Sequence, residues 1–500
     1  MPDSKIETIC YTIFDGGKTI KETLSTALAI LTCAICANAK NVEVDNFKAL
    51  ADGKTNNLAA IQKAIDECSA SGGGEVIFSE NGGTYLSGGP IILKNNVTLR
   101  IPRNAILKAI PAETSTKGFI YAKGAKNIGI TGGGTIDGSG GDYIVKEAAP
   151  KRCNLVLFER SENIRVTDIT LYNGATWTLN LLRCDTVFIS RIHINSHENF
   201  NNDGIDIDAK NVVITNSIID CDDDAICFKS HSRDFIVENV AVSNCVISSN
   251  CSFIKFGTAT LGGFKNITIT NCVMKKCTAS KLRNWNKFLS KFGVTDAITG
   301  IGGISLEAVD GGFADQIAIS NLSMTDVQTP IFIRVGHRNK DEQKSYIKNV
   351  IISNVTATSA SWITNSITCV EGHILKNITL RDCYFNLKAC TDEKSALKSL
   401  ETFVPEKVST YPENRMFGTL LPAYGFFLRR VDNLTMDNVQ MSYFGGNDQR
   451  HVVFGENIRG LRMMNCIWQK PFGSAESIKL KNSEKPYIFN CKEVKESFLQ

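Results

Sequence analysis

The stretch that decides the fold is Lys265–Cys272, which reads KNITITNC. Its isoleucines alternate with polar residues, as in a strand that packs one face against a core. The pattern occurs about eleven times along the chain, with a period of roughly 25 residues. Further copies begin at Glu162, Lys210, Glu238, Lys348, Lys376 and Asp432, and looser ones at Lys126, Asp185, Asp315 and Arg459. A period of this size predicts a solenoid, in which each copy supplies one strand of a coil.

These features predict an all-β protein with a right-handed parallel β-helix. A β-propeller fits poorly, because its blades take about 40 residues each. The leucine spacing of leucine-rich repeats is absent. An Asn recurs after the Thr or Ser of each copy, and we expect this Asn to stack on itself from coil to coil.

Two acidic clusters lie about one period apart. Residues 201–206 read NNDGID, and residues 222–224 read DDD. Because one period is one coil, we expect the clusters on adjacent coils, whose strands are about 4.8 Å apart. Carboxylates packed so closely perturb one another's pKa values, and such groups are more often catalytic than structural. The alternatives are a calcium site and a solvated turn.

A solenoid accommodates 500 residues without splitting into globular domains, because each coil contacts only its neighbours. We expect a signal peptide or N-terminal extension over residues 1–39 and an N-terminal cap with the first coils over 40–110. The catalytic β-helix is expected over 111–475 and a C-terminal cap over 476–500. The spacing of Leu58, Ile61 and Ile65 predicts a short capping helix. Long gaps after Asn271 and Cys383 predict insertions.

The net charge of +4 argues against a general nucleic-acid binder, although a local basic cleft for an acidic polymer stays possible. Lys18 and Lys21 precede an apolar stretch over residues 24–36 and then Ala37-Asn38-Ala39, which is typical of a secretory signal. We therefore expect an exported protein, either periplasmic or extracellular. No other segment is long and apolar enough to predict a membrane span.

The chain has 17 cysteines, whose spacing matches no zinc pattern. Several follow the recurring Asn, a position that suits a small buried residue, so we expect most to be free and buried. A pair between Cys221 and Cys227 is left open. Glycosylation sequons recur inside the strand pattern, where glycans would block stacking, which favours a bacterial source.

Over residues 45–470 the chain resembles glycoside hydrolase family 28, the polygalacturonase and rhamnogalacturonan hydrolase family. NNDGID resembles the family motif N-T-D-G-x-D, and residues 221–226 resemble its D-D motif one coil later. Residues 52–55, 60–62, 72–74 and Trp177 match as well. The resemblance implies a monomeric hydrolase that cleaves glycosidic bonds in pectic polysaccharide or oligosaccharide, with no cofactor or metal.

The resemblance also implies single displacement with inversion, in which an acid protonates the leaving oxygen while a base activates water, with carboxyls about 6.5–9.5 Å apart. By motif position, Asp223 is the expected acid. Asp203 and Asp224 are the expected pair that activates water. Neighbouring negative charges are expected to raise the pKa of the acid.

Two departures from the family concern its basic residues. The family's G-H-G is replaced within residues 249–258, which contain no His, and its R-I-K is replaced within residues 303–307. In polygalacturonases those basic groups are taken to hold the galacturonate carboxylate, so a different sugar is possible here. The expected substrate-binding residues are Asp206, Lys229, Lys255, Glu307, Arg334, His337 and Arg338. The alternatives are a turn or ladder residue for Asp206 and a solvated turn for the last three.

Two other functions stay open. A calcium-dependent pectate lyase would hold Ca²⁺ with the carboxylates and use Lys255 or Arg334 as a base. A non-catalytic β-helix would bind glycan without cleaving it. If the chain is a hydrolase, insertions near residues 280–300 and 390–425 favour exo action, because they would close one end of the cleft.

Overall fold

The computed structural model describes residues 39–498, apart from 116, 144–151, 282–288 and 340–342. The expected signal sequence lies outside the described residues, except for Ala39. Within the described ranges, no helix is long and apolar enough to cross a membrane.

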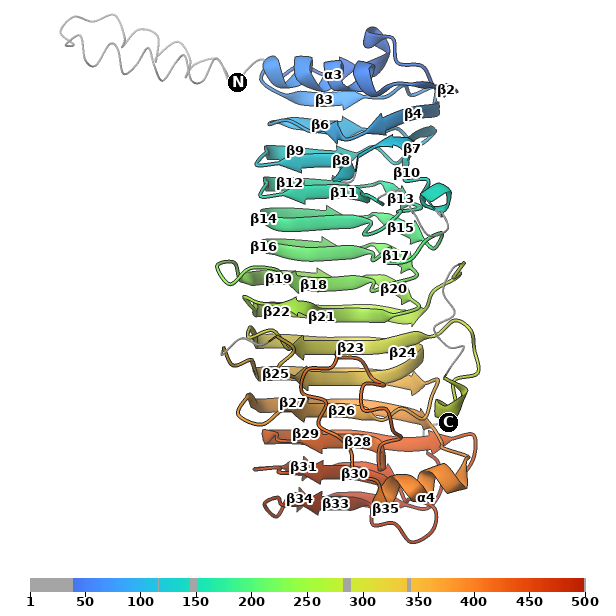
Figure 1. Ribbon diagram of the computed structural model, residues 1–500, viewed down its shortest axis with the longest axis vertical. Helices are drawn as coiled ribbons and strands as arrows, with labels where there is room; N and C mark the ends of the chain where they lie inside the picture. The colour runs from blue at the N-terminus through green and yellow to red at the C-terminus, as the bar shows by residue number, and fades with distance from the viewer. Residues whose placement is uncertain (1–38, 116, 144–151, 282–288, 340–342, 499–500) are drawn as a thin grey trace, which may run out of the picture.

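The chain winds into a long stack of coils (Figure 1) whose strands pair in parallel with those of the neighbouring coils. Three sheets run along the stack, and we call them sheets A, B and C. Each coil passes through sheet C, then A, then B. This architecture confirms the predicted parallel β-helix.

Sheet A is built from the sequence copies and holds β1 (Val42–Glu43), β3 (Gly74–Ile77), β6 (Val97–Arg100), β9 (Lys126–Thr131), β12 (Glu162–Thr167), β14 (Leu179–Ser190), β16 (Ile205–Thr215), β19 (Val237–Ser243), β22 (Phe264–Lys276), β24 (Phe313–Val335), β25 (Tyr346–Ser359), β27 (Ile374–Lys388), β29 (Asp432–Phe444), β31 (Arg462–Met464) and β34 (Tyr487–Phe489). The last parts of β22, β25, β27 and β29 bend on into sheet B, and β24 passes through all three sheets.

Sheet B also holds β2 (Asp52–Asn56), β4 (Gly83–Gly89), β7 (Ala105–Thr114), β10 (Thr135–Asp137), β13 (Thr170–Tyr172), β15 (His193–Ser196), β17 (Ile218–Cys221), β20 (Val246–Ser249), β32 (Ile467–Gln469) and β35 (Lys492–Val494). Sheet C holds the first parts of β14 and β16 with β5 (Ile91–Ile92), β8 (Gly118–Lys123), β11 (Asn154–Glu159), β18 (Ile226–Ser230), β21 (Ser252–Thr260), β23 (Gly300–Ala308), β26 (Asn365–Cys369), β28 (Ala423–Arg429), β30 (His451–Glu456) and β33 (Ile478–Lys481).

The alternation of the sequence explains the core. In sheet A, Val240 lies level with Ile267 and Val242 with Ile269. All four side chains are buried, whereas the residues between them point outward. Each coil thus adds a layer of β-branched side chains to one continuous apolar core.

Asparagines form two ladders on the outer edges of sheet A. The ladder expected from the Asn after Thr or Ser is present, with Asn321 donating to Asn271 at 3.0 Å and Asn354 to Asn321 at 3.0 Å. A second ladder, not expected from the sequence, uses the Asn before the first Ile or Val. There Asn239 donates to Asn211 at 2.9 Å and accepts from Asn266 at 2.8 Å.

The backbone explains why Asn recurs at these positions. The ladder residues have left-handed backbones, with φ of 59° at Asn239 and 56° at Asn271. Asn tolerates this conformation better than other residues with a Cβ. The ladder Asn therefore turns the chain and hydrogen-bonds the neighbouring coils.

The two ends of the stack differ. The expected helix is present as α3 (Leu58–Ala70), which buries Ile61 and Ile65 and lies at the N-terminal end beside β3 (Figure 1). The segment expected as a C-terminal cap instead contains β33, β34 and β35, which form one more coil on the stack. Short 3-10 turns occur as η1 (Val44–Phe47), η2 (Gly140–Tyr143) and η3 (Ser290–Phe292).

Both expected insertions are present, after β22 and after β27. The second, which we call the insert (residues 389–422), contains α4 (Glu393–Glu401) and crosses the outer face of sheet C (Figure 1). Its apolar side chains Val404, Met416 and Phe417 cluster with Phe332 and Phe427 of that sheet.

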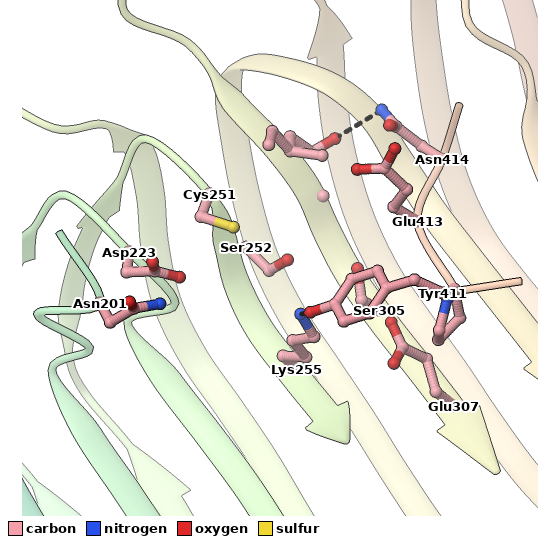
Figure 2. Close-up of a pocket in the computed structure, with 13 residues that line it drawn as sticks. Asn201, Asp223, Cys251, Ser252, Lys255, Ser305, Glu307, Tyr411, Glu413 and Asn414 are labelled. Carbon is pink, nitrogen blue, oxygen red and sulfur yellow. Dashed lines mark hydrogen bonds between the residues drawn. The ribbon is translucent and has the colours of Figure 1, made fainter. Parts of the chain in front are cut away.

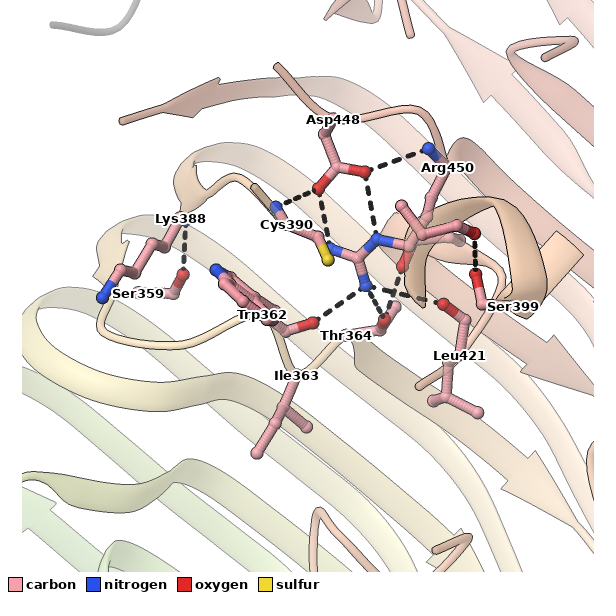
Figure 3. A network of polar contacts seen from close by, with 12 residues as sticks. Ser359, Trp362, Ile363, Thr364, Lys388, Cys390, Ser399, Leu421, Asp448 and Arg450 are labelled. Atoms are coloured by element: carbon pink, nitrogen blue, oxygen red, sulfur yellow. Dashed lines mark hydrogen bonds and ion pairs between the residues drawn. The ribbon is translucent and has the colours of Figure 1, made fainter. Parts of the chain in front are cut away.

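A buried ion pair holds both ends of the insert (Figure 3). The Arg450 guanidinium and the Asp448 carboxylate are 2.8 Å apart and almost fully buried. Asp448 accepts the backbone N–H of Cys390 at 2.8 Å, and Arg450 donates to the carbonyl of Leu421 at 3.5 Å and to that of Trp362 at 2.9 Å. The insert is therefore a fixed part of the structure.

The described cysteines are free thiols, including Cys221 and Cys227, and all except Cys491 are buried. Burial raises the pKa of thiols such as Cys184, to about 12. This agrees with the expectation that most cysteines serve as small core residues.

Asn239→Ala should lower the free energy of unfolding by about 1–2 kcal/mol, because it removes two ladder hydrogen bonds. In addition, Ala adopts a left-handed backbone less readily than Asn, whose side chain can hydrogen-bond locally. Urea unfolding measures the change. Asn239→Gly, which keeps the backbone conformation but loses the bonds, should cost less. An Ala variant as stable as the parent would show that the ladder contributes nothing.

Candidate active site

Strand register brings the two acidic clusters together at the start of sheet C. Ile205 of β16 pairs with Ile226 of β18, so Asp203 lies level with Asp224 on the next coil. The N–H of Gly204 donates to the carbonyl of Asp224 at 2.9 Å, which continues the ladder through the turn. The expected meeting of the clusters on adjacent coils is confirmed.

Asp224 is held as a carboxylate. Its Oδ2 lies 3.1 Å from the Nζ of Lys255, and its Oδ1 accepts the N–H of Ser252 at 3.1 Å. Burial alone would raise its pKa, but the charges of Lys255 and Lys229 lower it below the usual value. Asp224 therefore stays ionised inside the protein.

Asp203 and Asp206 share one lysine. The Nζ of Lys229 lies 3.6 Å from Asp203 Oδ2 and 3.5 Å from Asp206 Oδ1, and it lies 5.1 Å from the ring centre of Trp177. Burial and then the neighbouring carboxylates raise the pKa of Asp203 well above its usual value. Burial raises that of Asp206 to about 7, against the opposing charge of Lys229. These two buried carboxyls therefore hold protons more readily than ordinary aspartates.

Asp223 faces the open part of the site. Its side chain is almost buried and lines a cleft of about 270 Å³. Its Oδ1 accepts the N–H of Asp224 at 3.0 Å, and its carbonyl accepts the hydroxyl of Ser249 at 2.6 Å. The turn is thereby fixed with the Asp223 carboxyl directed at the cleft (Figure 2).

Figure 2 shows the cleft between the coils and the insert. Sheet C contributes Ser252, Lys255, Ser305 and Glu307, and the insert contributes Tyr411, Pro412, Glu413 and Asn414. The Lys255 ammonium donates to the Tyr411 hydroxyl at 3.1 Å. Asn414 donates to the carbonyl of Ile301 at 3.0 Å, which holds the insert against β23. The insert therefore forms one wall of the cleft.

Glu307 lies at the far side of this cleft. It is 1% exposed, and among the described residues its Oε2 has no hydrogen-bond partner. Burial raises its pKa to about 8, against the nearby charge of Lys255. A neutral carboxyl group therefore lines the cleft at pH 7.

The three expected basic residues beyond Glu307 do not line the cleft. Arg334 is 1% exposed and donates to the carbonyls of Glu406 and Lys407 at 2.8 and 3.1 Å. His337 donates its backbone N–H to Val408 at 3.0 Å. These contacts support the insert, so the position of Arg334 does not support a role in sugar binding.

Arg338 is also paired with another residue of the protein. Its guanidinium makes a two-pronged ion pair with Asp310, at 2.9 and 2.8 Å. In turn, Asp310 accepts the N–H of Thr260 at 3.1 Å. Arg338 therefore fixes the loop after β23 and, like Arg334, offers no free charge to a substrate in the cleft.

Tyr411 and Ser305 line the cleft but were not among the site residues expected from the sequence. The register explains Ser305, which lies level with Lys255 on the next coil, where the family has its R-I-K. Tyr411 reaches Lys255 across 156 residues of sequence, so no local pattern could predict that contact.

The clustered acids are poorly suited to calcium. Among the described residues, three buried groups place at least three potential metal ligands close together, and each group includes a cysteine: Asp203, Asp224 and Cys227; Asp223, Asp224 and Cys251; and His197, Asp220 and Cys277. Calcium prefers six to eight oxygen ligands. Lys229 also pairs with Asp203 of the first group, and Lys255 pairs with Asp224, which belongs to the first two groups.

Comparison with known proteins agrees with the sequence resemblance. The family model described as glycosyl hydrolases family 28 matches residues 81–403. An exopolygalacturonase of Zea mays is 23% identical over 386 residues, which cover 71% of this chain and 88% of that protein. An endo-polygalacturonase of Pectobacterium carotovorum subsp. carotovorum is 24% identical over 317 residues, covering 57% of this chain and 73% of that protein.

Among solved structures, a hyperthermoactive exopolygalacturonase from Thermotoga maritima matches with a TM-score of 0.58 and 22% identity, over 69% of this chain and 87% of that one. At this identity the likeness supports the fold.

Glu307→Gln should stabilise the protein at pH 8 but not at pH 4. The carboxyl has a pKa of about 8 when folded and 4.5 ordinarily, so the folded state binds the extra proton between these values and loses stability as pH rises through them. Because Gln does not ionise, the Glu307→Gln variant should have a free energy of unfolding at pH 8 that is higher by on the order of 1–3 kcal/mol. Denaturant midpoints at both pH values measure this, with Glu162→Gln on the surface as the control. An equal change in the free energy of unfolding at both pH values would contradict the raised pKa of Glu307.

Proposed function

Because this chain belongs to glycosyl hydrolases family 28 and is a glycosidase, we propose that it cleaves pectic polysaccharide or oligosaccharide by single displacement with inversion. The observation that supports this best is the level placement of Asp203 and Asp224 beside Asp223, which lines the cleft. The proposal needs no cofactor and uses only the side chains of this chain.

Asp223 is the proposed general acid. Its carboxyl lines the cleft and is directed into it, whereas the neighbouring Asp224 is paired with Lys255. A proton on Asp223 would pass to the oxygen of the breaking glycosidic bond as the sugar leaves.

Asp224 and Asp203 are the proposed pair that holds the attacking water. Carboxylate oxygens of the two residues lie within 4.8 Å of each other, a separation that a water hydrogen-bonded to both can bridge. Because Lys255 keeps Asp224 ionised, Asp224 is the member that accepts the proton of the water. Asp203, whose pKa is raised by burial, then orients the water by hydrogen bonding, next to Lys229.

The insert supports exo action. It crosses sheet C on the C-terminal side of the acids, and its Tyr411 and Asn414 contact cleft residues directly. Arg334, Arg429 and the Arg450–Asp448 pair anchor it, so it is unsuited to opening for a long polymer. Two of the similar proteins above carry the name exopolygalacturonase.

The calcium-dependent lyase is the less favoured alternative. Lys229 and Lys255 occupy the carboxylates that a calcium ion would need, and the acidic groups contain cysteine in place of oxygen ligands. Arg334, one of the bases considered for a lyase, is buried against the insert.

We further propose export to the periplasm or outside the cell of a bacterium, and action as a monomer. The signal-like pattern before Ala39 supports export. A pectic polymer is too large to be cleaved inside a cell before uptake, which makes export consistent with the proposed substrate.

Asp223→Asn should lower kcat by about 10²–10⁴-fold and leave substrate affinity nearly unchanged, because the amide keeps the shape but cannot donate the proton. Reducing-end assays on pectic oligosaccharides and equilibrium binding measure the two effects. Asp234→Asn, on an exposed turn, is the control and should retain full activity. Unchanged turnover in Asp223→Asn would remove this residue from the mechanism. Loss of wild-type activity with a chelator, together with an unsaturated, ultraviolet-absorbing product, would instead support the lyase.

Early products should be the shortest sugars, with no intermediate chain lengths, because the insert admits only one end of the polymer. Chromatography of the first products from a defined oligosaccharide measures their length. Tyr411→Ala should increase the share of longer products, whereas Tyr384→Ala on sheet B should not. A broad mixture of lengths from the wild type at the first time points would contradict exo action.

A further inference from the structure

The polar groups of the cleft indicate which sugars it accepts. Four charged or acidic side chains line it: Asp223, Lys255, Glu307 and Glu413. Three of these are acids, and Lys255 is the one basic residue among the described lining residues. The cleft therefore has an excess of carboxyl groups where a sugar next to the scissile bond must lie.

The one lysine is already engaged. Its Nζ lies 3.1 Å from Asp224 Oδ2 and donates to the Tyr411 hydroxyl at 3.1 Å. Lys255 is itself buried, with 5% exposure. Pairing with Asp224 offsets the charge of the lysine, and a sugar carboxylate that displaced Asp224 would leave a buried carboxylate without its partner.

Glu307 has the properties of a ligand to an uncharged group. It is 1% exposed, it lines the cleft, and its Oε2 lacks a hydrogen-bond partner among the described residues. A buried polar atom without a partner is costly unless a ligand supplies one. A sugar hydroxyl or ester carbonyl fits this role, whereas a second carboxylate would meet like charge whenever Glu307 ionises.

We propose that the part of the cleft next to Glu307 binds an uncharged sugar unit, either a neutral sugar or an esterified uronic acid, and that Glu307 sets this preference. The proposal rests on the proposed hydrolase function and specifies its substrate class. It assigns substrate recognition here to Glu307 and not to Lys255, although both were expected to bind substrate.

The protonation of Glu307 agrees with this geometry. Burial raises its pKa to about 8, Asp224 adds to the rise, and Lys255, Lys229 and Arg338 oppose it. Near pH 7 the protonated carboxyl can both donate and accept a hydrogen bond with a sugar hydroxyl.

The test compares three pectic oligosaccharides that differ only in the two units flanking the scissile bond, which carry free carboxylates, methyl esters or neutral hydroxymethyl groups. At pH 7, kcat/KM should be at least about tenfold higher for one of the two uncharged forms than for the free acid. Whether the ester or the hydroxymethyl form is faster identifies the natural unit. A faster free acid would overturn the proposal.

Glu307→Gln tests the residue itself. Measured at pH 9, above the Glu307 pKa of about 8, the isosteric amide removes a negative charge from the cleft, so kcat/KM on the free acid should rise and the preference for uncharged forms should shrink severalfold. Glu371→Gln, at an exposed position, is the matched control. If folded Glu307→Gln protein keeps the wild-type ratio of kcat/KM on the uncharged forms to kcat/KM on the free acid, Glu307 does not set the preference for uncharged sugars.

Binding separates this proposal from the proposed function. If none of the three sugars is hydrolysed, the hydrolase assignment fails, and calorimetric binding of the same sugars to the wild type then decides the inference. Tighter binding of an uncharged form supports it. Equal binding, tighter binding of the free acid, or no binding overturns it.

Discussion

Parallel stacking of one coil on the next is the constraint on which this structure depends. Because strands in a sheet lie about 4.8 Å apart, residues one period apart in sequence become vertical neighbours. The same register that stacks Val240 on Ile267 in the core places Asp203 level with Asp224 and Cys227 level with Lys255 at the surface of sheet C. The active site is therefore an outward column of a repeat whose inward columns make the core.

Stacking carboxyl groups so closely creates an electrostatic problem, and the two lysines solve it in different ways. Lys255 pairs with Asp224 and keeps it ionised, whereas Lys229 is shared between Asp203 and Asp206, whose pKa values stay raised. Unequal pairing gives neighbouring acids different protonation states, which acid–base chemistry requires. It also balances the charges of both lysines inside the protein, which weakens their attraction for an acidic sugar. The reaction and the proposed substrate preference thus follow from the same ion pairs.

Sequence alone predicted the features that repeat and missed the contacts that do not. The KNITITNC pattern predicted the β-helix, one Asn ladder and the meeting of Asp203 with Asp224, because each depends on one residue per coil. The second Asn ladder was visible in the same pattern, but its left-handed backbone became evident only in the structure. The role of Arg334 could not be predicted, because its partners Glu406 and Lys407 lie in the insert, more than 70 residues away. The contact between Tyr411 and Lys255 escaped prediction for the same reason.

The central claim is that carboxyls on adjacent coils hydrolyse a glycosidic bond by a single displacement. Proton NMR of the first product, recorded before the sugar mutarotates, tests this most directly. The account predicts a newly formed reducing end whose anomeric configuration is opposite to that of the bond cleaved. A product that retains the original configuration would require a covalent intermediate and would contradict the roles assigned to Asp203, Asp223 and Asp224.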